Sequence, residues 1–277
     1  MIRFSLVVAT CGRTEEIITL FASIRNQQRT DLETIVVDQN QDERLTPLVE
    51  NLRKFITVRH IRTPIQNVSA ARNLGLDAAQ GEIVAFPDDD CWYPRGLLDY
   101  VDQWFVKNST YGVFAVGAVD EDGLSSGNRW IQDRCDIRSW NCLRTTFCSS
   151  LFLTALEQAR GVRFDERLSR GEETDFILRL LAKGVRGRFD RQRVIRHPRR
   201  DMLSGTVSQE RAISYGAGMG QLVRRHSLVF LWATLLLYDL ARAVLVIARG
   251  RRRDAAFCFA HARGLCKGFM LPGVSYD

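Results

Sequence analysis

Short apolar segments alternate with helix-compatible segments over the first 90 residues of the chain. Ser5–Thr10, Thr34–Val37 and Ile83–Phe86 are mostly apolar and lack the polar alternation of a half-exposed strand, and Val58–Ile61 is a shorter strand candidate. Buried strands of this kind, separated by helices, are typical of a mostly parallel sheet with helices on both faces. We therefore predict an α/β fold, in which ligands bind at the carboxyl ends of the strands.

Three helices are predicted between these strands. The first begins after Thr14, which can act as its N-cap, and the second covers Leu45–Phe55. The third covers Asn67–Gly81, with the glycine as its stop. Farther along, Gly171–Gly184 is predicted to be a helix with acidic residues in its first turn and the final glycine as its cap.

The C-terminal quarter of the chain is predicted to be helical, and its last helix runs from Asp254 to about Met270. The glycine-rich stretch Tyr215–Gly220 follows a helix-like segment rather than a strand. We therefore interpret its glycines as sites of close helix packing and not as a dinucleotide-binding loop.

Acidic residues follow two of the predicted strands. Asp38 ends the second strand, and Asp88–Asp90 follow the strand that begins at Ile83. Adjacent carboxylates repel one another, but at a strand end they can bind a hard divalent cation such as Mg²⁺ or Mn²⁺. A solvated acidic turn is the alternative for three aspartates alone. A further acidic cluster, Glu172-Glu173, favours a functional site.

The chain has 277 residues and a net charge of +7, which fits an anionic partner such as a phosphate group, nucleic acid or anionic lipid. Its basic runs lack the interleaved aromatic residues that stack on bases, so we do not expect a nucleic-acid partner. The seven cysteines are odd in number and form no CxxC pair, which favours free thiols in a reducing compartment. The N-terminal residues do not resemble a secretory signal, and we expect a cytoplasmic location.

One apolar segment raises the question of membrane contact. Leu228–Ala248 is interrupted by Asp239 and Arg242. A spanning helix needs about 20 apolar residues, and each central charge costs about 2.5–3.5 kcal/mol. A span is therefore less expected than a packing or dimer helix, or a helix at the membrane surface. Arginines flank the segment on both sides, and each adds about 1 kcal/mol of attraction to anionic lipid. We predict peripheral contact with the cytoplasmic face of the membrane through residues 224–253.

Five segments, in order, resemble glycosyltransferase family 2: SLVVATCGR, VVDQN, NVSAARNLGLDAAQGEIVAFPDDDCWYP, RGEETDFILRLLAKG and the histidine of VIRHP. The resemblance covers roughly residues 3–200, and the run from ARNLG to DDD is its most specific part because many positions match at fixed spacing. It implies a GT-A fold with a Rossmann-like sheet, and the C-terminal region predicted above adds a helical extension to that fold. It also implies inverting transfer of a sugar from a nucleoside-diphosphate sugar to an acceptor hydroxyl, with a lipid-linked molecule or a polysaccharide as acceptor.

The resemblance implies roles for individual residues. The residues expected to bind the nucleotide-sugar donor are Thr10, Arg13, Asp38, Arg72, Asn73, Asp88 and Asp89. Asp38 is expected to contact the nucleoside base or ribose. Asp90 is the expected direct ligand of a divalent cation, Mg²⁺ or Mn²⁺, with Asp88 beside it and with His197 at the metal or the diphosphate.

The stretch GEETD stands where the family commonly has Gly-Glu-Asp. The second acid of that pair is the general base in the family, so Glu173 is the expected base and Glu172 is the alternative. Without the resemblance, both acids would be explained by stabilisation of a helix N-terminus, which is worth about 0.3–1 kcal/mol. Asp175, one helical turn on, is expected to support the acceptor site, and Arg179 to pair with an acid.

The predicted organisation has two parts. Residues 1–205 form the catalytic domain, with a nucleotide-sugar half at about 1–110 and an acceptor half at about 111–205, and residues 206–277 form a helical region. Two other functions are compatible with the acids. A nucleotidyltransferase would use the same metal and carboxylates, but it has no need for a second acid pair at a separate helix start. A non-catalytic protein that binds nucleotide-sugars or nucleic acid would not depend on Asp90.

Overall fold

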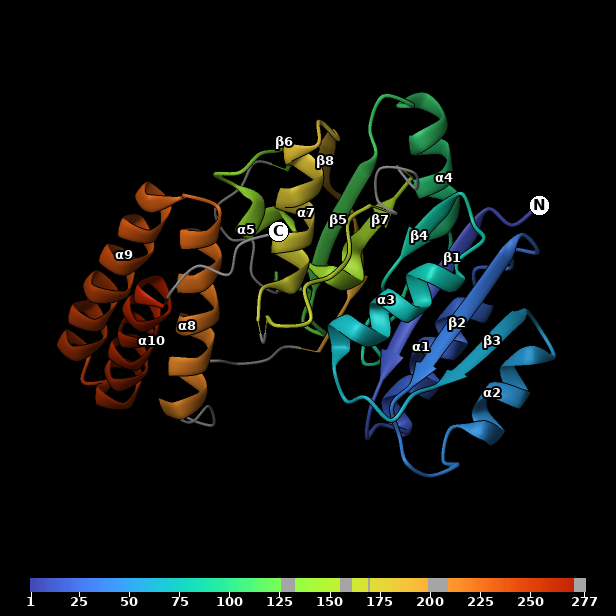
Figure 1. Cartoon of the computed structure of the whole chain (residues 1–277), viewed down its shortest axis with the longest axis horizontal. Coiled ribbons are helices and arrows are strands. Elements are labelled where there is room, and N and C mark those ends of the chain that lie inside the picture. Colours follow the sequence, from blue (N-terminus) through green and yellow to red (C-terminus); the bar gives the residue numbers. More distant parts are fainter. Residues whose placement is uncertain (126–132, 155–160, 169, 199–208, 272–277) are drawn as a thin grey trace. The chain divides into compact units, whose positions relative to one another are not determined.

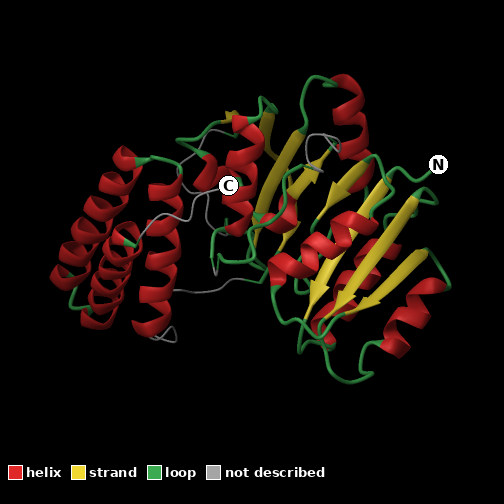
Figure 2. Ribbon diagram, viewed as in Figure 1, coloured by secondary structure: helices red, strands yellow, loops and turns green. Residues whose placement is uncertain are grey.

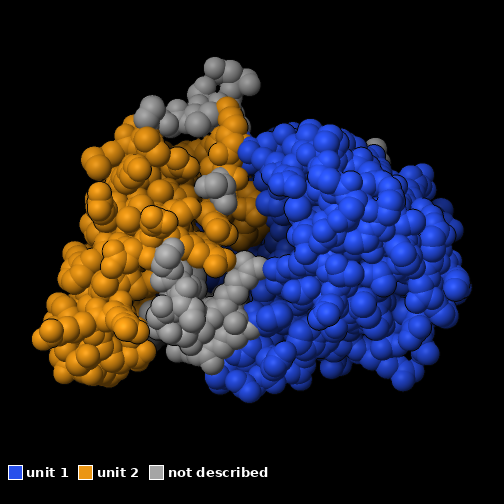
Figure 3. All heavy atoms as spheres, turned by 90° about the horizontal axis from the view of Figure 1, so that it is seen from below, with its two compact units in different colours: residues 1–166, 176–199 blue, residues 167–175, 200–277 orange. Residues whose placement is uncertain are grey.

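The computed structural model describes residues 1–125, 133–154, 161–168, 170–198 and 209–271. The chain divides into two compact units (Figure 3). The first, here called the sheet unit, comprises residues 1–166 and 176–199. The second, here called the helical unit, comprises residues 167–175 and 200–277. A short segment from the middle of the chain thus groups with the C-terminal helices, while the predicted division at residue 205 stays a prediction.

The sheet unit contains an eight-stranded sheet with the order β3-β2-β1-β4-β7-β5-β8-β6 (Figures 1 and 2). The strands are β1 (Phe4–Thr10), β2 (Leu32–Asp38), β3 (Thr57–Arg62), β4 (Ile83–Ala85), β5 (Val113–Val119), β6 (Arg134–Ile137), β7 (Leu151–Leu153) and β8 (Gly187–Arg196). Strands β1 to β4 pair in parallel, as do β5 and β8. The short strand β7 runs antiparallel between β4 and β5, and β6 is an antiparallel edge strand. The predicted α/β class is therefore confirmed.

Helices cover both faces of this sheet, as Figure 1 shows for α1 and α3. The helices of the sheet unit are α1 (Glu15–Arg25), α2 (Thr46–Arg53), α3 (Val68–Ala78), α4 (Leu97–Lys107), the single turns α5 (Cys142–Thr145) and η1 (Cys148–Ser150), and most of α7 (Glu172–Ala182). Leu6 and Val8 of β1 point into a core that β1 shares with α1, α2 and α4. Val7, between them, faces α3, where a Cβ added to Gly75 would overlap it. Both faces are buried, so the strand sequence is apolar without alternation.

One predicted helix end is wrong. Helix α3 ends at Ala78, and Ala79 is already extended, so Gly81 does not cap it. Gly81 instead lies so close to β1 that a Cβ would be 2.6 Å from the backbone nitrogen of Ser5. The Ser5 hydroxyl accepts a hydrogen bond from the Gly81 N–H at 2.7 Å and donates to the buried carboxylate of Glu33 at 2.6 Å. Gly81 is needed because the two backbones nearly touch.

The end of α7 agrees with prediction. Gly184 has a left-handed backbone with φ +81°. The N–H of Gly184 donates to Leu181 at 3.0 Å, and the N–H of Val185 donates to Leu180 at 3.1 Å. This pair of bonds is a Schellman motif, which glycine favours because it has no Cβ.

The helical unit contains three long helices, α8 (Gln209–Arg225), α9 (Val229–Ala248) and α10 (Arg252–Met270). Gly216 and Gly220 of α8 face α10, and Cβ atoms added there would overlap the carbonyl oxygens of His261 and Leu265. Gly264 and Gly268 of α10 approach the backbone of α8 in the same way. Gly216 and Gly220 of the stretch Tyr215–Gly220 therefore allow close packing of α8 on α10, as the sequence predicts.

Candidate active site

The three consecutive aspartates lie in a loop directly after β4, at the carboxyl edge of the sheet. The N–H of Cys91 donates to the Asp88 carbonyl at 3.1 Å, which turns the chain back. Trp92 then pairs with Arg196 at the end of β8 through two backbone hydrogen bonds of 2.9 and 3.0 Å. This small bridge brings the residue after Arg196, His197, beside the aspartates, although it is distant in sequence.

Asp88, Asp90 and His197 form a group whose ligand atoms all lie within 4.8 Å of one another. The His197 Nε2 atom is 3.1 Å from Asp90 Oδ1 and 3.8 Å from Asp88 Oδ2. The other ring nitrogen, Nδ1, lies 2.9 Å from the carbonyl oxygen of Pro198. A carbonyl can only accept, so Nδ1 donates and Nε2 is directed at the carboxylates. Two carboxylates and an imidazole are ligands that a divalent cation takes, and the 3.1 and 3.8 Å distances from His197 lie within the about 4.2 Å that can separate two ligands at about 2.1 Å from the ion.

The pKa values of Asp90 and Asp89 shift in opposite directions. Burial alone would raise the pKa of Asp90, but the hydrogen bond to His197 and the charges of His197 and Arg13 hold it well below its usual range. Burial would lower the pKa of His197, yet Asp90 and Asp88 raise it. For Asp89, burial dominates and raises the pKa to about 6, despite Thr10 and Arg13. Asp90 is therefore the carboxylate held ionised, as a metal ligand must be.

Two arginines compensate the negative charge of the loop. Arg13 forms ion pairs with Asp89, at 2.9 Å, and with Asp90. The buried Arg72 of α3 donates to Asp88 Oδ1 at 2.9 Å. Both were predicted as donor-binding residues, and the structure brings them to the aspartates. The Ser149 hydroxyl donates to Asp88 Oδ2 at 2.6 Å, a contact that nothing in the sequence around this serine indicates.

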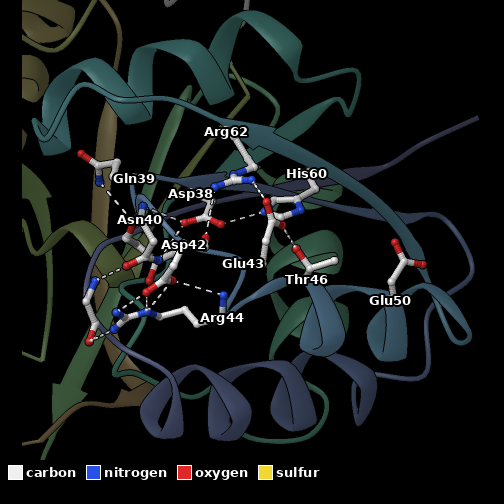
Figure 4. Close-up of polar contacts among 12 residues, drawn as sticks. Asp38, Gln39, Asn40, Asp42, Glu43, Arg44, Thr46, Glu50, His60 and Arg62 are labelled. Atoms are coloured by element: carbon white, nitrogen blue, oxygen red, sulfur yellow. Dashed lines mark hydrogen bonds and ion pairs between the residues drawn. The ribbon is translucent and has the colours of Figure 1, made fainter.

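Asp38 lies at the end of β2, opposite Thr10 of β1, inside a polar network (Figure 4). Its Oδ1 atom accepts from the backbone and side-chain nitrogens of Asn40 at 2.9 and 2.7 Å. Its Oδ2 atom lies 3.0 Å from His60 Nε2. Sequence reasoning missed Asn40 and His60. In the β2–β3 register His60 pairs with Val36, two residues before Asp38, which places both polar side chains on one face.

Asn73 of α3 holds a neighbouring segment. Its amide nitrogen donates to the Phe164 carbonyl and to the Glu166 carboxylate, both at 3.0 Å. Its amide oxygen accepts from the Phe164 N–H at 2.8 Å. These bonds fix residues 164–166 against α3, while a contact of Asn73 with a donor stays a prediction.

The two residues predicted as the general base and its alternative, Glu173 and Glu172, lie in the helical unit. Glu172 and Glu173 form the start of α7 and are half-buried. Asp175 is fully buried and contacts His226 and Arg225 at 2.9 and 3.6 Å, and its support of the acceptor site stays a prediction. Arg179, in the sheet unit, donates to the Arg163 carbonyl at 2.5 Å.

A Rossmann-like sheet with an Asp-x-Asp loop and a histidine at its carboxyl edge defines the GT-A class of nucleotide-sugar transferase folds. The family model described as Glycosyl transferase family 2 matches residues 5–151. The chain belongs to this family. The family, the enzyme class and the fold predicted from the sequence are thereby confirmed. The family favours a glycosyltransferase over the two alternatives, a nucleotidyltransferase and a non-catalytic binding protein.

Two curated relatives illustrate the range of the family. A GalNAc(5)-diNAcBac-PP-undecaprenol beta-1,3-glucosyltransferase of Campylobacter jejuni is 36% identical over 189 residues, which are 64% of this chain and 59% of that protein. The succinoglycan biosynthesis protein ExoM of Rhizobium meliloti is 29% identical over 183 residues, 61% of this chain and 58% of that protein. The chain thus spans less than two thirds of the length of these relatives.

Two solved structures show the same fold. Staphylococcus aureus TarS 1–349 in complex with UDP-GlcNAc has a TM-score of 0.65 at 16% identity, covering 94% of this chain and 90% of that one. The mannosyltransferase PcManGT of Pyrobaculum calidifontis, in complex with GDP-Man and Mn²⁺, has a TM-score of 0.67 at 14% identity, covering 97% and 87%.

Proposed function

We propose that the protein is an inverting glycosyltransferase that moves a sugar from a nucleoside-diphosphate sugar to an acceptor hydroxyl. The observation that carries the proposal is the Asp88–Asp90–His197 group at the carboxyl edge of the sheet, in a chain of glycosyltransferase family 2. Structures of similar fold have been solved with UDP-GlcNAc and with GDP-Man and Mn²⁺, which supports a sugar nucleotide as donor and a divalent cation as cofactor.

The chemistry explains why these residue types are needed. Breaking the bond between sugar and diphosphate builds positive charge on the sugar ring and negative charge on the leaving oxygens. A divalent cation, when held by Asp88, Asp90 and His197, supplies Lewis-acid stabilisation of that leaving group. Arg13, which pairs with Asp90, and Arg72, which pairs with Asp88, add positive charge where negative charge develops. Asp38 offers a carboxylate, positioned by Asn40 and His60, to the nucleoside.

The acceptor hydroxyl must lose a proton as it attacks. We assign this step to Glu173, the second acid of GEETD, with Glu172 as the alternative. General-base catalysis of this kind typically accelerates a reaction by about 10²–10⁴-fold. Attack from the face opposite the leaving group inverts the configuration at the anomeric carbon. Asp90 and Glu173 therefore have separate roles, one in donor binding and one in proton transfer.

The proposed acceptor is a lipid-linked molecule or a polysaccharide at the cytoplasmic face of the membrane. The undecaprenol-linked substrate in the name of the Campylobacter relative supports the first choice. Helix α9 supports it as well. Among the described residues, α9 is the one helix that by length and composition could cross a membrane, and 17% of its most apolar window is buried.

Helix α9 exposes apolar side chains and buries an acidic one, which is the reverse of an ordinary surface helix. Leu237 and Val244 are 66% and 65% exposed, whereas Asp239 is buried and contacts His261 of α10 at 2.6 Å. The apolar side faces outward and the acid faces inward. A patch of this kind marks an interaction site. Exposed arginines follow it at 249 and 251–253, so we propose that residues 224–253 lie in the surface of an anionic membrane.

The enzymatic proposal is tested by a donor panel of UDP-glucose, UDP-N-acetylglucosamine and GDP-mannose with MnCl₂, scored by release of nucleoside diphosphate. We expect release with at least one donor, loss of release in Asp90→Asn, and loss of transfer with retained nucleotide binding in Glu173→Gln. Proton NMR of the product then shows whether the anomeric centre is inverted. Full transfer by Glu173→Gln would remove the proposed base.

The membrane proposal is tested by sedimentation of the full chain with anionic phosphatidylglycerol vesicles and with neutral phosphatidylcholine vesicles. We expect binding to the anionic vesicles that weakens with salt and that is reduced by Val244→Asn. Val106→Asn is the matched control, because Val106 is 72% exposed on α4 of the sheet unit. Equal binding of both variants and the wild type would show that the outer face of α9 is not the contact.

A further inference from the structure

The first turn of α7 contains one acid whose environment differs from that of its neighbours. Asp175 is fully buried, whereas Glu172 and Glu173 of the same turn are half-buried. A carboxylate removed from water is tolerated when charged or hydrogen-bonding groups surround it. Asp175 therefore serves an internal contact rather than the surface.

The partners of Asp175 come from the C-terminal end of α8. His226 Nε2 lies 2.9 Å from Asp175 Oδ1, and an ionised carboxylate only accepts, so the ring nitrogen donates. Arg225 NH1 lies 3.6 Å from the same oxygen, and its side chain is 6% exposed. We call Asp175, Arg225 and His226 the α7–α8 clasp.

The end of α8 holds His226 in place. Ser227 has a left-handed backbone with φ +55°. The N–H of Ser227 donates to Arg224 at 3.0 Å, and the N–H of Leu228 donates to Val223 at 2.7 Å. These two bonds form a Schellman motif, so the backbone at His226 is defined.

The helix dipoles of α7 and α8 also stabilise the charged side chains of the clasp. Asp175 lies in the first turn of α7, where the helix end is partially positive, and Arg225 and His226 lie at the end of α8, where it is partially negative. Each side chain is thus stabilised by its own helix as well as by its partner. The result is a fixed junction between the start of α7 and the end of α8.

We propose that the α7–α8 clasp positions the first turn of α7, and with it Glu173, for transfer, which makes Asp175 and His226 positioning residues. This inference rests on the proposed role of Glu173 as base. Asp175 lies two residues after Glu173 in the same helical turn, so a contact that holds Asp175 also holds the backbone that carries Glu173. The backbone of the base is then held by the helical unit.

The expected effect is on turnover rather than on donor binding. A shift of about 1 Å in a reacting group can cost about 100-fold in rate. His226→Ala removes the ring nitrogen that donates to Asp175 and should lower kcat by about ten- to a hundredfold. The KM for the donor should stay within about twofold, because the predicted donor-binding residues belong to the sheet unit.

The experiment compares three variants of the full chain. His226→Ala removes the clasp donor, and His226→Gln supplies an amide N–H at similar reach and should restore most of the activity. His261→Ala is the matched control, because it breaks the other histidine–aspartate contact of the helical unit, the one to Asp239. Kinetics use the sugar nucleotide of the panel that gives the most nucleoside diphosphate.

A second readout needs no substrate. The N–H of Asp175 donates to the Gly171 carbonyl at 2.9 Å, so hydrogen exchange of this amide reports opening of the first turn. We expect faster exchange in His226→Ala, recovery in His226→Gln, and no change in His261→Ala. Unchanged exchange in His226→Ala, or an equal loss of kcat in His261→Ala, overturns the positioning role. Full transfer by Glu173→Gln refutes the base itself and leaves the exchange data as the test of the clasp.

Discussion

The metal group gives the most direct prediction. Asn in place of Asp90 has nearly the same volume, but it removes one of the two carboxylates of the Asp88–Asp90–His197 group. Asn in place of Asp89 makes the same change one residue earlier, outside that group. The pair of variants therefore separates loss of a metal ligand from loss of a negative charge in the loop.

The magnitude follows from linkage between binding and folding. A ligand at 100 times its Kd stabilises the native state by about 2.7 kcal/mol. For a chain of this size 1 kcal/mol corresponds to about 2–4 °C in Tm, so saturating MnCl₂ should raise Tm by about 5–10 °C. Because His197 and Arg13 lower the pKa of Asp90, the ionised carboxylate stabilises the metal-free fold too. The Tm of metal-free Asp90→Asn is then lower, so the metal-induced shift is compared within each variant.

Thermal unfolding is followed with and without MnCl₂, each in the absence and presence of UDP or GDP, because a diphosphate completes the proposed site. We expect the full shift in the wild type and in Asp89→Asn, and less than about 1 °C in Asp90→Asn. An undiminished shift in Asp90→Asn would refute the assignment of Asp90. Loss of the shift in both variants would show that the loop attracts the cation by charge alone.

Two further predictions concern stability. Gly216→Ala should lower the free energy of unfolding by about 1–3 kcal/mol. The reason is that the new Cβ would lie 2.8 Å from the Leu265 nitrogen, whereas ordinary contact begins at 3.4 Å. Thermal unfolding measures the effect, and Ser214→Ala on the same helix is the control, which should be nearly neutral. Asp31→Asn should lower Tm at pH 6, and the difference from the wild type should shrink as the pH falls below 3.8. Arg29 lowers the pKa of Asp31 below 3.8, so the stabilisation is present above that value and is lost as pH falls through the folded pKa. The exposure of Asp31 keeps the effect under about 1 kcal/mol, and a constant Tm difference from pH 3 to pH 6 would contradict it.

Local patterns in the sequence predicted those features that depend on local chemistry. The buried strands follow from runs without alternation, and the acids at strand ends follow from chain order, because parallel strands end at one edge. Gly184 was predicted correctly because a helix cap is a local motif. Gly81 was misassigned because its role depends on the distance to Ser5, which is set by tertiary packing.

Tertiary contacts account for what the sequence did not predict. His60 contacts Asp38 only once β2 and β3 are in register, and Asn40 contacts it where the chain turns after β2. Ser149 of η1 donates to Asp88 because the fold brings η1 beside the loop after β4. The inward orientation of Asp239 depends on His261 of another helix. The charges that argue against membrane contact in the sequence are therefore not all on the outer surface.

The order of the strands has a consequence for the boundaries of a stable fragment. The family match ends at residue 151, at the start of β7, but β5 takes β7 on one side and β8, residues 187–196, on the other. A fragment cut at that point would leave β5 with unpaired backbone groups along both edges and an apolar surface on both faces. Exposed strands of this kind recruit other chains. We expect such a fragment to aggregate, while the chain through β8 can close its own sheet.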